Sequence, residues 1–386
     1  MSSYPSTSRA AVLGPDGLHT TQVDVPSALP GGGLLQVEAA AVCGSDLNHY
    51  RDESFRKRGG VILGHENAGS VVSVDDEAAD RWGVEVGDRV YVEEFIGCKS
   101  CRQCATGQYN MCARTDWRAP GTLRYGRTPI SVSPGLWGGF SQYLYLHPQA
   151  ILHKLPDSLL SEVAVWANPI ANGMRWLYEI AALRPEERVV IVGPGPHGLG
   201  CAIAAQQLTS EVAVVGLSGD EGRLRDARRL GVAYTHVVGE RPLEQCFLFE
   251  DGSGPDVVVD LTQSHDVLQA ALVTVSKGGR IVLAGHKVNS FSTDQLPTLS
   301  QRELSVLGVS GPTYSSVSAA IKYLDHNSEQ MKGLNTLICG LDDVEGGLHA
   351  VAGEEGLRPT HAVIVDTSGD GNSRYSSRGT DRGGVS

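Results

Sequence analysis

The sequence predicts an α/β protein with two domains, a mostly β domain and a doubly wound parallel sheet covered by helices. The first observation is the alternation of apolar strands with helix-compatible segments between about residues 161 and 283, which is typical of a parallel sheet wrapped by helices. The second is a series of short β-type runs separated by Gly and Pro between about residues 10 and 155, which indicates a small β domain with long loops. A length of 386 residues also favours two domains.

The expected elements follow in chain order. The β domain should contain strands at residues 34–38 and 88–92. The second domain should contain a strand at 188–192, a helix at 197–208, a strand at 211–215, a helix at 221–230, and strands at 256–260 and 280–283. A last apolar strand, at 361–365, is expected to return to the first domain.

These elements divide the chain. We assign residues 1–160 and 300–366 to the mostly β domain and residues 161–299 to the parallel-sheet domain. Residues 367–386 contain Ser, Gly, Arg and Asp with almost nothing apolar, so we expect them to form a disordered tail.

Composition excludes several classes of partner. Hydrophobic residues make up 41% of the chain, enough for a sizeable core, and the net charge of −12 gives no support for binding to nucleic acid or to an anionic membrane. No segment approaches the roughly 18 apolar residues that span a bilayer, and residues 1–9 lack the apolar core of a signal peptide. We therefore expect a cytoplasmic protein that acts on a small molecule.

Four cysteines, Cys98, Cys101, Cys104 and Cys112, follow the spacing C-x2-C-x2-C-x7-C. Four thiolates on one short loop can close a tetrahedral shell around a single Zn²⁺ and leave no open position, which is the arrangement of a structural site. Four scattered thiols or two disulfides are the alternatives. Because the chain has only 8 cysteines, this crowding favours the structural zinc site, and such a site suits a reducing cytoplasm.

A glycine fingerprint marks a dinucleotide site. The segment Gly193-Pro194-Gly195-Pro196-His197-Gly198 has the pattern G-x-G-x-x-G, directly after a strand and at the start of a helix. The glycines allow a tight turn and a close approach to a pyrophosphate, and the helix N-terminus supplies N–H donors. An ordinary Gly-rich turn is the alternative. His197 is either positioned near the phosphates or a solvated loop residue.

The end of the next strand bears on the choice of cofactor. NAD sites usually have an Asp or Glu there for the ribose hydroxyls, whereas this strand ends in Gly216-Leu217-Ser218. Ser218 and Arg223 can hold a 2′-phosphate, although Asp220 and Glu221 are near enough to reach a ribose. We predict a preference for NADP(H) over NAD(H).

A third group of candidate residues lies in the first domain. Cys43-Gly44-Ser45-Asp46 follows one apolar run, and Gly64-His65-Glu66 follows another. A Cys and a His on two loops can bind a catalytic zinc that keeps one position open for a substrate oxygen. Taken singly, a cysteine such as Cys43 is more often a small buried hydrophobe, and a histidine such as His65 is more often structural. We expect Asp46 to support the Cys43 loop.

The sequence resembles the zinc-containing medium-chain dehydrogenase/reductase family, which includes alcohol, sorbitol and threonine dehydrogenases. Five motifs carry the resemblance, in this order: Cys43-Gly44-Ser45-Asp46, Gly64-His65-Glu66, the four cysteines, Gly138-Gly139-Phe140 and the glycine fingerprint. The resemblance covers nearly the whole chain up to about Asp366. It implies a GroES-like catalytic domain, a Rossmann cofactor domain, an active site in the cleft between them, and a homodimer or homotetramer.

The resemblance also implies roles for single residues. Cys43 and His65 would be ligands of the catalytic zinc, and Glu66 would be the neighbouring carboxylate that can enter its shell. Ser45 would relay the proton of the substrate hydroxyl.

Two positions depart from the family pattern. The family's third zinc ligand is a Cys, Asp or Glu, and the matching residue here is Asn168, whose neutral amide oxygen is a poor zinc ligand. Either Glu66 completes the shell, or Asn168 does so weakly, or the metal is loose or absent. Asn48 stands where the family has its relay histidine, with His49 next to it, so the proton would leave through His49, Glu66 or water.

These predictions together indicate a zinc-dependent oxidoreductase that transfers a hydride between a nicotinamide cofactor and an alcohol or polyol, or its carbonyl product. A zinc-independent enoyl or quinone reductase and a non-catalytic nucleotide-binding scaffold are the alternatives, and the number of bound zinc ions separates them. The loop at 114–137, with Trp117, Arg124, Tyr125 and Arg127, is expected either to shape the substrate pocket or to lie on the surface.

Overall fold

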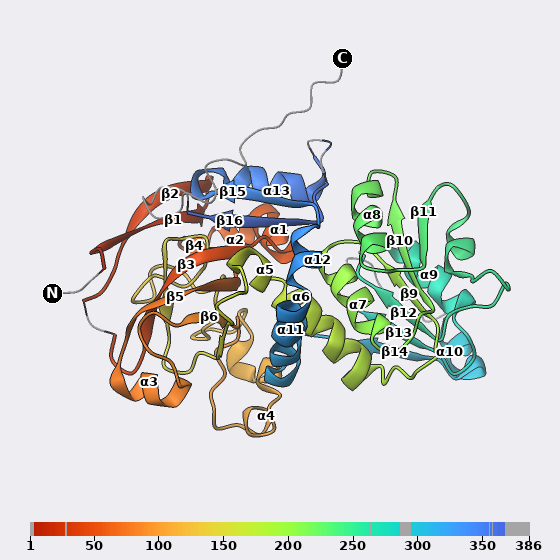
Figure 1. Cartoon of the computed structure of the whole chain (residues 1–386), viewed down its shortest axis with the longest axis horizontal. Coiled ribbons are helices and arrows are strands. Elements are labelled where there is room, and N and C mark those ends of the chain that lie inside the picture. The colour runs from red at the N-terminus through yellow and green to blue at the C-terminus, as the bar shows by residue number, and fades with distance from the viewer. Residues whose placement is uncertain are drawn as a thin grey trace, which may run out of the picture.

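The computed structural model describes residues 4–27, 29–262, 264–285, 295–354, 356 and 358–366. The tail predicted at 367–386 lies outside the described residues. Figure 1 shows two lobes, one with its sheet at the left and one with its sheet at the right, joined by helices between them.

Six parallel strands form the sheet of the right-hand lobe in Figure 1. Their order is β11-β10-β9-β12-β13-β14, and every neighbouring pair is parallel. The strands are β9 (Val189–Val192), β10 (Val212–Leu217), β11 (Tyr234–Val238), β12 (Val257–Asp260), β13 (Arg280–Leu283) and β14 (Ser305–Gly308). The strand order reverses between β9 and β12, and ligands of such sheets bind at the carboxyl ends of the strands at this point.

Helices connect these strands and cover the sheet. They are α7 (Pro196–Gln206), α8 (Glu221–Arg229), α9 (His265–Thr274), α10 (Leu296–Arg302) and the 3₁₀ turn η4 (Leu243–Phe247). Val189 and Ile191 of β9 belong to one apolar cluster, and Val190 and Val192 to another. Both faces of β9 are therefore buried, which explains its wholly apolar sequence.

The division predicted between residues 299 and 300 falls inside α10. Beyond it, β14 still pairs with β13, through Ser305 opposite Arg280 and Gly308 opposite Leu283. The parallel sheet thus extends to Gly308. The short segment Ser305–Gly308 has only two strongly apolar residues, so sequence alone did not mark it as a strand.

The other lobe is built on a seven-stranded sheet with the order β15-β16-β3-β5-β6-β8, in which β7 also pairs with β3. Its strands are β3 (Gly33–Ala41), β5 (Glu66–Val74), β6 (Arg89–Val92), β7 (Tyr143–Leu146), β8 (Leu152–Lys154), β15 (Thr336–Gly340) and β16 (His361–Val365). A second sheet contains β1 (Thr7–Gly14), β2 (Gly17–Asp24) and β4 (Val61–Ile62). The pairing of β16 with β3 returns the end of the described chain to this lobe, as predicted for residues 361–365.

Short helices complete this lobe. They are α1 (Gly44–Arg51), α2 (Glu53–Arg56), α3 (Asp76–Trp82), α4 (Arg102–Ala105), α5 (Ser161–Ala164), α13 (Val344–Ala352), and the 3₁₀ turns η1 (Tyr109–Met111), η2 (Ala113–Thr115) and η6 (Leu341–Asp343).

The helices between the lobes are α6 (Ala167–Met174), its π-helical continuation η3 (Arg175–Ile180), α11 (Tyr314–His326) and α12 (Ser328–Lys332). Helix α6 crosses α7 at very short range. A Cβ atom on Gly200 would lie 2.2 Å from the carbonyl oxygen of Pro169, and one on Gly173 would lie 2.5 Å from that of Gly200. Only glycine fits at these two positions.

The lobes share one core. Its largest apolar cluster includes Ala39 from β3, Ile170 from α6 and Leu199 from α7. Among the described residues, the longest apolar helices fall short of what a membrane crossing needs.

Candidate active site

The four cysteines predicted to bind structural zinc come together in one loop, residues 98–112, which we call the cysteine lobe. Their sulfur atoms all lie within 4.8 Å of one another. The Sγ atoms of Cys98 and Cys104 are 4.0 Å apart, and those of Cys101 and Cys112 are 3.7 Å apart. A tetrahedron with Zn–S bonds of about 2.3 Å has edges of about 3.8 Å. These two sulfur pairs are close to this edge, so the four thiols are placed to surround a zinc ion.

Local structure explains why the cysteine lobe adopts this shape. Cys101 is the N-cap residue of α4, and its Sγ accepts a hydrogen bond from the N–H of Cys104. Tyr109 anchors the lobe because its hydroxyl donates to the buried carboxylate of Glu93, which also contacts His153 Nε2 at 2.7 Å. The cysteine lobe is thus tied by buried polar contacts to the residue that follows β6 and to β8.

Cys43 and His65 approach each other because β3 pairs with β5. Ala41, the last residue of β3, lies opposite Glu66, the first residue of β5, so the segments that flank them are neighbours. Cys43 then begins α1 as its N-cap, and the Asp46 carboxylate accepts from the Cys43 N–H at 3.0 Å. Asp46 therefore supports the Cys43 loop, as expected from the sequence.

Asp46 also orients His65. Its Oδ1 lies 3.2 Å from His65 Nδ1 and 3.3 Å from Arg127 Nη1, and all three side chains are buried. Burial opposes ionisation of Asp46, but His65 and Arg127 outweigh it and hold the Asp46 pKa well below its usual range. Asp46 in turn outweighs burial and raises the pKa of His65 well above its usual range, so a metal at Nε2 would displace a proton. With its Nδ1–H on Asp46, the ring would then present Nε2, the usual arrangement of a metal-binding histidine.

Glu66 is the second buried carboxylate of the site. Its side chain is 1% exposed, and Oε1 lies 3.9 Å from His65 Nε2. Burial raises the pKa of Glu66 to about 7, against the opposing effects of His65 and of Asn168. Its one side-chain hydrogen bond comes from Asn168, whose Nδ2 donates to Oε1 at 2.7 Å. A cation at this position would compensate the buried charge.

The structure adds His197, which the sequence placed either near the phosphates or among solvated loop residues. One ring nitrogen of His197, the Cys43 thiol and a Glu66 oxygen lie within 4.8 Å of one another. His197 Nε2 also lies 3.0 Å from Asn172 Nδ2, and burial lowers the pKa of His197 to about 4. The imidazole is therefore neutral at pH 7. Cys43, His65, Glu66 and His197 offer sulfur, nitrogen and oxygen donors that suit zinc.

Arg127 also belongs to this group of buried polar residues. Its guanidinium is buried and donates to Ser45 Oγ at 3.0 Å, to Asp46 Oδ1 and to the carbonyl oxygen of Gly126. The sequence offered only its membership of the 114–137 loop, with no signal for this contact. The loop thus supplies a cation beneath the Cys43–Asp46 segment.

His49 lies near this network, since Arg127, Asp46 and His65 all act on its pKa, but its ring packs among aromatic side chains. Its ring stacks on Phe55, with 4.0 Å between ring centroids, and meets the edge of Trp117 at 4.9 Å. Burial lowers its pKa to about 3. Among the hydrogen bonds of the described residues, none joins His49 to Ser45.

The fingerprint glycines are in the geometry that a dinucleotide site needs. The loop Gly193–Gly198 connects the carboxyl end of β9 to α7, with Gly195 as N-cap and Pro196 as the first helical residue. Gly198 packs against the turn itself, since a Cβ atom there would lie 1.9 Å from the carbonyl oxygen of Gly193. The loop therefore offers the first N–H groups of α7 at the switch point of the sheet.

Beyond the tip of β10, the two residues proposed to hold a 2′-phosphate have different positions. Ser218 is exposed. Arg223 is buried, and its guanidinium donates to the carbonyl oxygens of Pro359 and Val351 and pairs with Asp220 at 3.4 Å. Its donors are thus directed at the protein. Glu221 is exposed and accepts from the N–H of Gly219.

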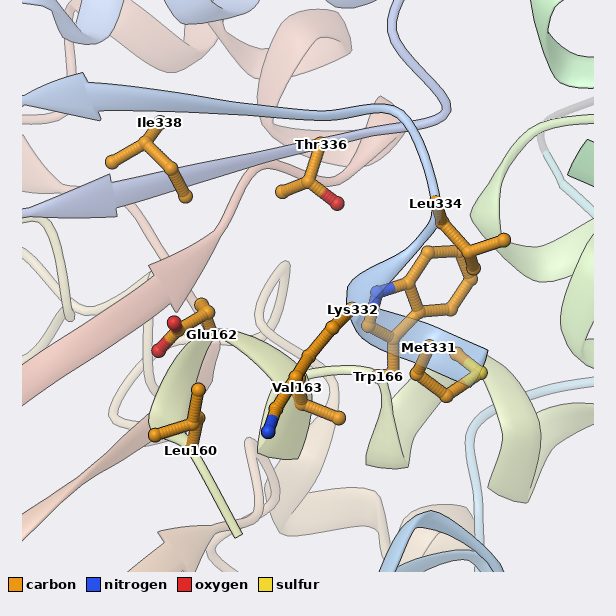
Figure 2. Close-up of a pocket in the computed structure, with 9 residues that line it drawn as sticks. All are labelled: Leu160, Glu162, Val163, Trp166, Met331, Lys332, Leu334, Thr336 and Ile338. Carbon is orange, nitrogen blue, oxygen red and sulfur yellow. The ribbon is translucent and has the colours of Figure 1, made fainter. Parts of the chain in front are cut away.

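A separate cavity lies away from all these groups. Figure 2 shows its lining, which includes Val163 of α5, Trp166 just after that helix and Met331 of α12, around a volume of about 90 Å³. None of the predicted metal, proton-relay or cofactor residues lines it. It gives no reason to place the chemistry there.

Comparison with known proteins agrees with this geometry. Residues 30–157 match the family described as "Alcohol dehydrogenase GroES-like domain", and residues 198–326 match "Zinc-binding dehydrogenase". A probable alcohol dehydrogenase of Mycobacterium tuberculosis is 33% identical over 92% of this chain and 98% of its own length. An erythritol/L-threitol dehydrogenase of Mycolicibacterium smegmatis is 32% identical over 92% of this chain and 97% of its own.

Solved structures also share this fold. The crystal structure of an alcohol dehydrogenase from Thermotoga maritima superposes with a TM-score of 0.78 over 93% of this chain and 99% of that one, at 22% identity. The chain belongs to the zinc-binding alcohol dehydrogenase family. Both the resemblance and the α/β fold class predicted from the sequence, a GroES-like domain with a Rossmann domain, are thereby confirmed.

The cysteine lobe yields the first prediction. Cys101→Ser should reduce bound zinc by one ion per chain and lower the thermal midpoint, because metal binding contributes to the folding free energy. Zinc analysis and thermal unfolding measure both effects. Cys246→Ala, a buried cysteine outside the lobe, should keep its zinc. A soluble Cys101→Ser protein with unchanged zinc and unchanged midpoint would contradict the structural role.

Arg127 yields the second. Arg127→Met leaves Asp46 buried without its guanidinium partner, and breaking a buried pair costs about 3 kcal/mol or more. The free energy of unfolding by urea should fall by that amount. Arg118→Met, which breaks the exposed pair with Asp116, should change it by less than about 1 kcal/mol. Equal changes in the free energy of unfolding for the two substitutions would show that the contact between Arg127 and Asp46 does not stabilise the fold.

Proposed function

We propose that the protein is a zinc- and nicotinamide-dependent dehydrogenase that interconverts an alcohol or polyol and its carbonyl product. One observation carries the proposal: the half-buried Cys43 thiol and the buried Glu66 carboxylate lie within 4.8 Å of His197, a residue of the dinucleotide loop. A metal held by these donors and a nicotinamide held by that loop would meet at one place. When bound, zinc polarises the substrate oxygen as a Lewis acid and the nicotinamide accepts the hydride.

The residues of the chain have distinct tasks in this proposal. Cys43, His65 and Glu66 hold the metal, and Asp46 keeps His65 in the tautomer that presents Nε2. Ser45 accepts the proton of the substrate hydroxyl at Oγ and passes its own proton outward. The Arg127 cation, 3.0 Å from Ser45 Oγ, favours loss of the serine proton. A role for His49 finds no support in its aromatic packing, so we propose that the proton passes from Ser45 to solvent.

The substrate class rests on the relatives. Their printed names describe alcohol dehydrogenases and an erythritol/L-threitol dehydrogenase. We therefore propose an alcohol or polyol as the substrate. A zinc-independent reductase remains the second candidate because Asn168 stands at the family's third ligand position, and zinc content decides between them.

We propose NADP(H) as the preferred cofactor on narrower grounds than the sequence suggested. Ser218 is exposed where a ribose-binding carboxylate is usual, which leaves room for a 2′-phosphate. Arg223 gives no support, because its guanidinium is bonded to the protein. Glu221 is the carboxylate that would favour NAD(H) instead.

The assembly and the compartment belong to the same proposal. We propose a homodimer or homotetramer by family resemblance. A cytoplasmic location is supported by 8 cysteines without a disulfide among them.

The metal supplies the main test. The protein as purified should contain two zinc ions per chain and oxidise an alcohol or polyol with NADP⁺ or NAD⁺. Glu66→Gln should lower turnover and catalytic zinc occupancy together, each by about tenfold or more, while the structural zinc stays. Steady-state kinetics and zinc analysis measure the two.

Glu85→Gln, at an exposed position, is the matched control and should behave like the wild type. Full zinc and full activity in Glu66→Gln would exclude Glu66 as a ligand. Hydride transfer by a wild type that holds a single zinc ion would exclude the zinc mechanism and favour the reductase.

Cofactor preference has its own test. Ser218→Asp should lower kcat/KM with NADP(H) by about tenfold or more, since a carboxylate repels the 2′-phosphate, and should leave kcat/KM with NAD(H) nearly unchanged. Gly216 is a worse position, because a Cβ atom there would lie 3.0 Å from Pro194 and 3.1 Å from Asp220. Ser218→Asn is the uncharged control. Better efficiency with NAD(H) in the unmodified enzyme would refute the preference.

A further inference from the structure

His197 has a position that dinucleotide binding does not explain. It is the second residue of α7. The glycines of the fingerprint and the backbone N–H groups at this helix N-terminus suffice for a pyrophosphate. Its imidazole reaches the metal candidates of the other lobe, with one ring nitrogen within 4.8 Å of both the Cys43 sulfur and a Glu66 oxygen.

Asn168 is oriented to hold another side chain and not a metal. Its amide nitrogen donates to Glu66 Oε1 at 2.7 Å, and its amide oxygen accepts from Asn172 Nδ2 at 3.3 Å. Only the oxygen of an amide side chain binds metal ions, and here that oxygen is directed along α6 toward Asn172. The position where the family has a charged ligand therefore supplies none.

The ring of His197 is held in place by the same helix. Asn172 Nδ2 lies 3.0 Å from Nε2, and the Trp176 ring is nearly parallel to the imidazole, with 5.9 Å between centroids and 18° between planes. Asn168 and Asn172 are one helical turn apart, so α6 fixes Glu66 and His197 side by side. Because an amide nitrogen only donates, Asn172 now occupies the Nε2 lone pair, and a metal bound at this nitrogen would replace that hydrogen bond.

The charges of this group also suit a divalent ion. A Cys43 thiolate and the Glu66 carboxylate together carry two negative charges, and Glu66 is 1% exposed with one amide donor as its side-chain hydrogen bond. Two negative charges side by side, one buried and one half-buried, need compensation. Zn²⁺ would balance them, and the imidazoles of His65 and His197, neutral when bound to the metal, would add donors without changing the sum.

We infer that His197 is a further protein ligand of the catalytic metal, in addition to Cys43, His65 and Glu66, and replaces the charged ligand that the family has at the position of Asn168. The inference rests on the proposed zinc-dependent function. Because Cys43 and Glu66 belong to one lobe and His197 to the other, the metal would link the two lobes directly at the dinucleotide loop.

Zinc content of substituted proteins tests this inference. His197→Val should retain one zinc ion per chain where the wild type holds two, and His236→Val, a substitution on β11 of the same lobe, should keep both. His197→Cys restores a donor and should recover the second zinc. In the cobalt-substituted proteins, the d–d absorption of the catalytic site should be lost in His197→Val and shifted in His197→Cys.

The outcomes separate the inference from the proposed function. Two zinc ions and an unchanged cobalt spectrum in His197→Val overturn the inference alone. A wild type with only the structural zinc overturns the proposed function and the inference together. Dinucleotide binding, followed by fluorescence, reports whether the loop is intact. If His197→Val loses the second zinc ion and also loses dinucleotide binding, His197→Cys decides the matter. Two zinc ions per chain in His197→Cys support the ligand role, and one overturns it.

Discussion

The close crossing of α6 and α7 is the constraint on which the site depends. The two helix backbones touch because Gly173 and Gly200 carry no side chains at the crossing, where a Cβ atom would lie 2.5 Å or less from a carbonyl oxygen. This contact sets the N-terminus of α7 beside the polar face of α6. It brings His197 of the dinucleotide loop to Asn172, and through Asn172 and Asn168 to Glu66. A bulkier residue at either glycine would separate the lobes at the point where the chemistry is expected.

Around this crossing, the buried charges are arranged in a connected group. Arg127 and His65 both contact Asp46, and Asp46 in turn caps α1 at Cys43. Each contact compensates a charge that burial would otherwise penalise. The group therefore holds the Cys43 loop and the His65 ring by the same interactions that make burial tolerable. The cysteine lobe stands apart from this network and has its own anchors, Tyr109 and Glu93.

The sequence by itself determined the parts that depend on contiguous residues. The spacing of Cys98, Cys101, Cys104 and Cys112 specifies a compact thiol cluster because all four lie on one short loop. The glycine fingerprint specifies a strand–turn–helix unit for a similar reason, since strand, turn and helix N-terminus are encoded within a dozen residues. Asp46 lies three residues after Cys43, so its capping role is also local. The alternation of strands and helices then indicated the fold class that the comparisons confirmed.

Only the tertiary structure decided which side chains from distant segments meet and which way they face. Arg127 lies 81 residues from Asp46 and Asn168 lies 102 residues from Glu66, and no local pattern fixes either contact. Arg223 looks available in the sequence, but folding directs its guanidinium to Val351 and Pro359. His49 is adjacent to the expected relay position, yet its ring turns toward Phe55 and Trp117. The reason is common to all four: a side-chain direction depends on helix crossings and strand pairings that form between segments far apart in the chain.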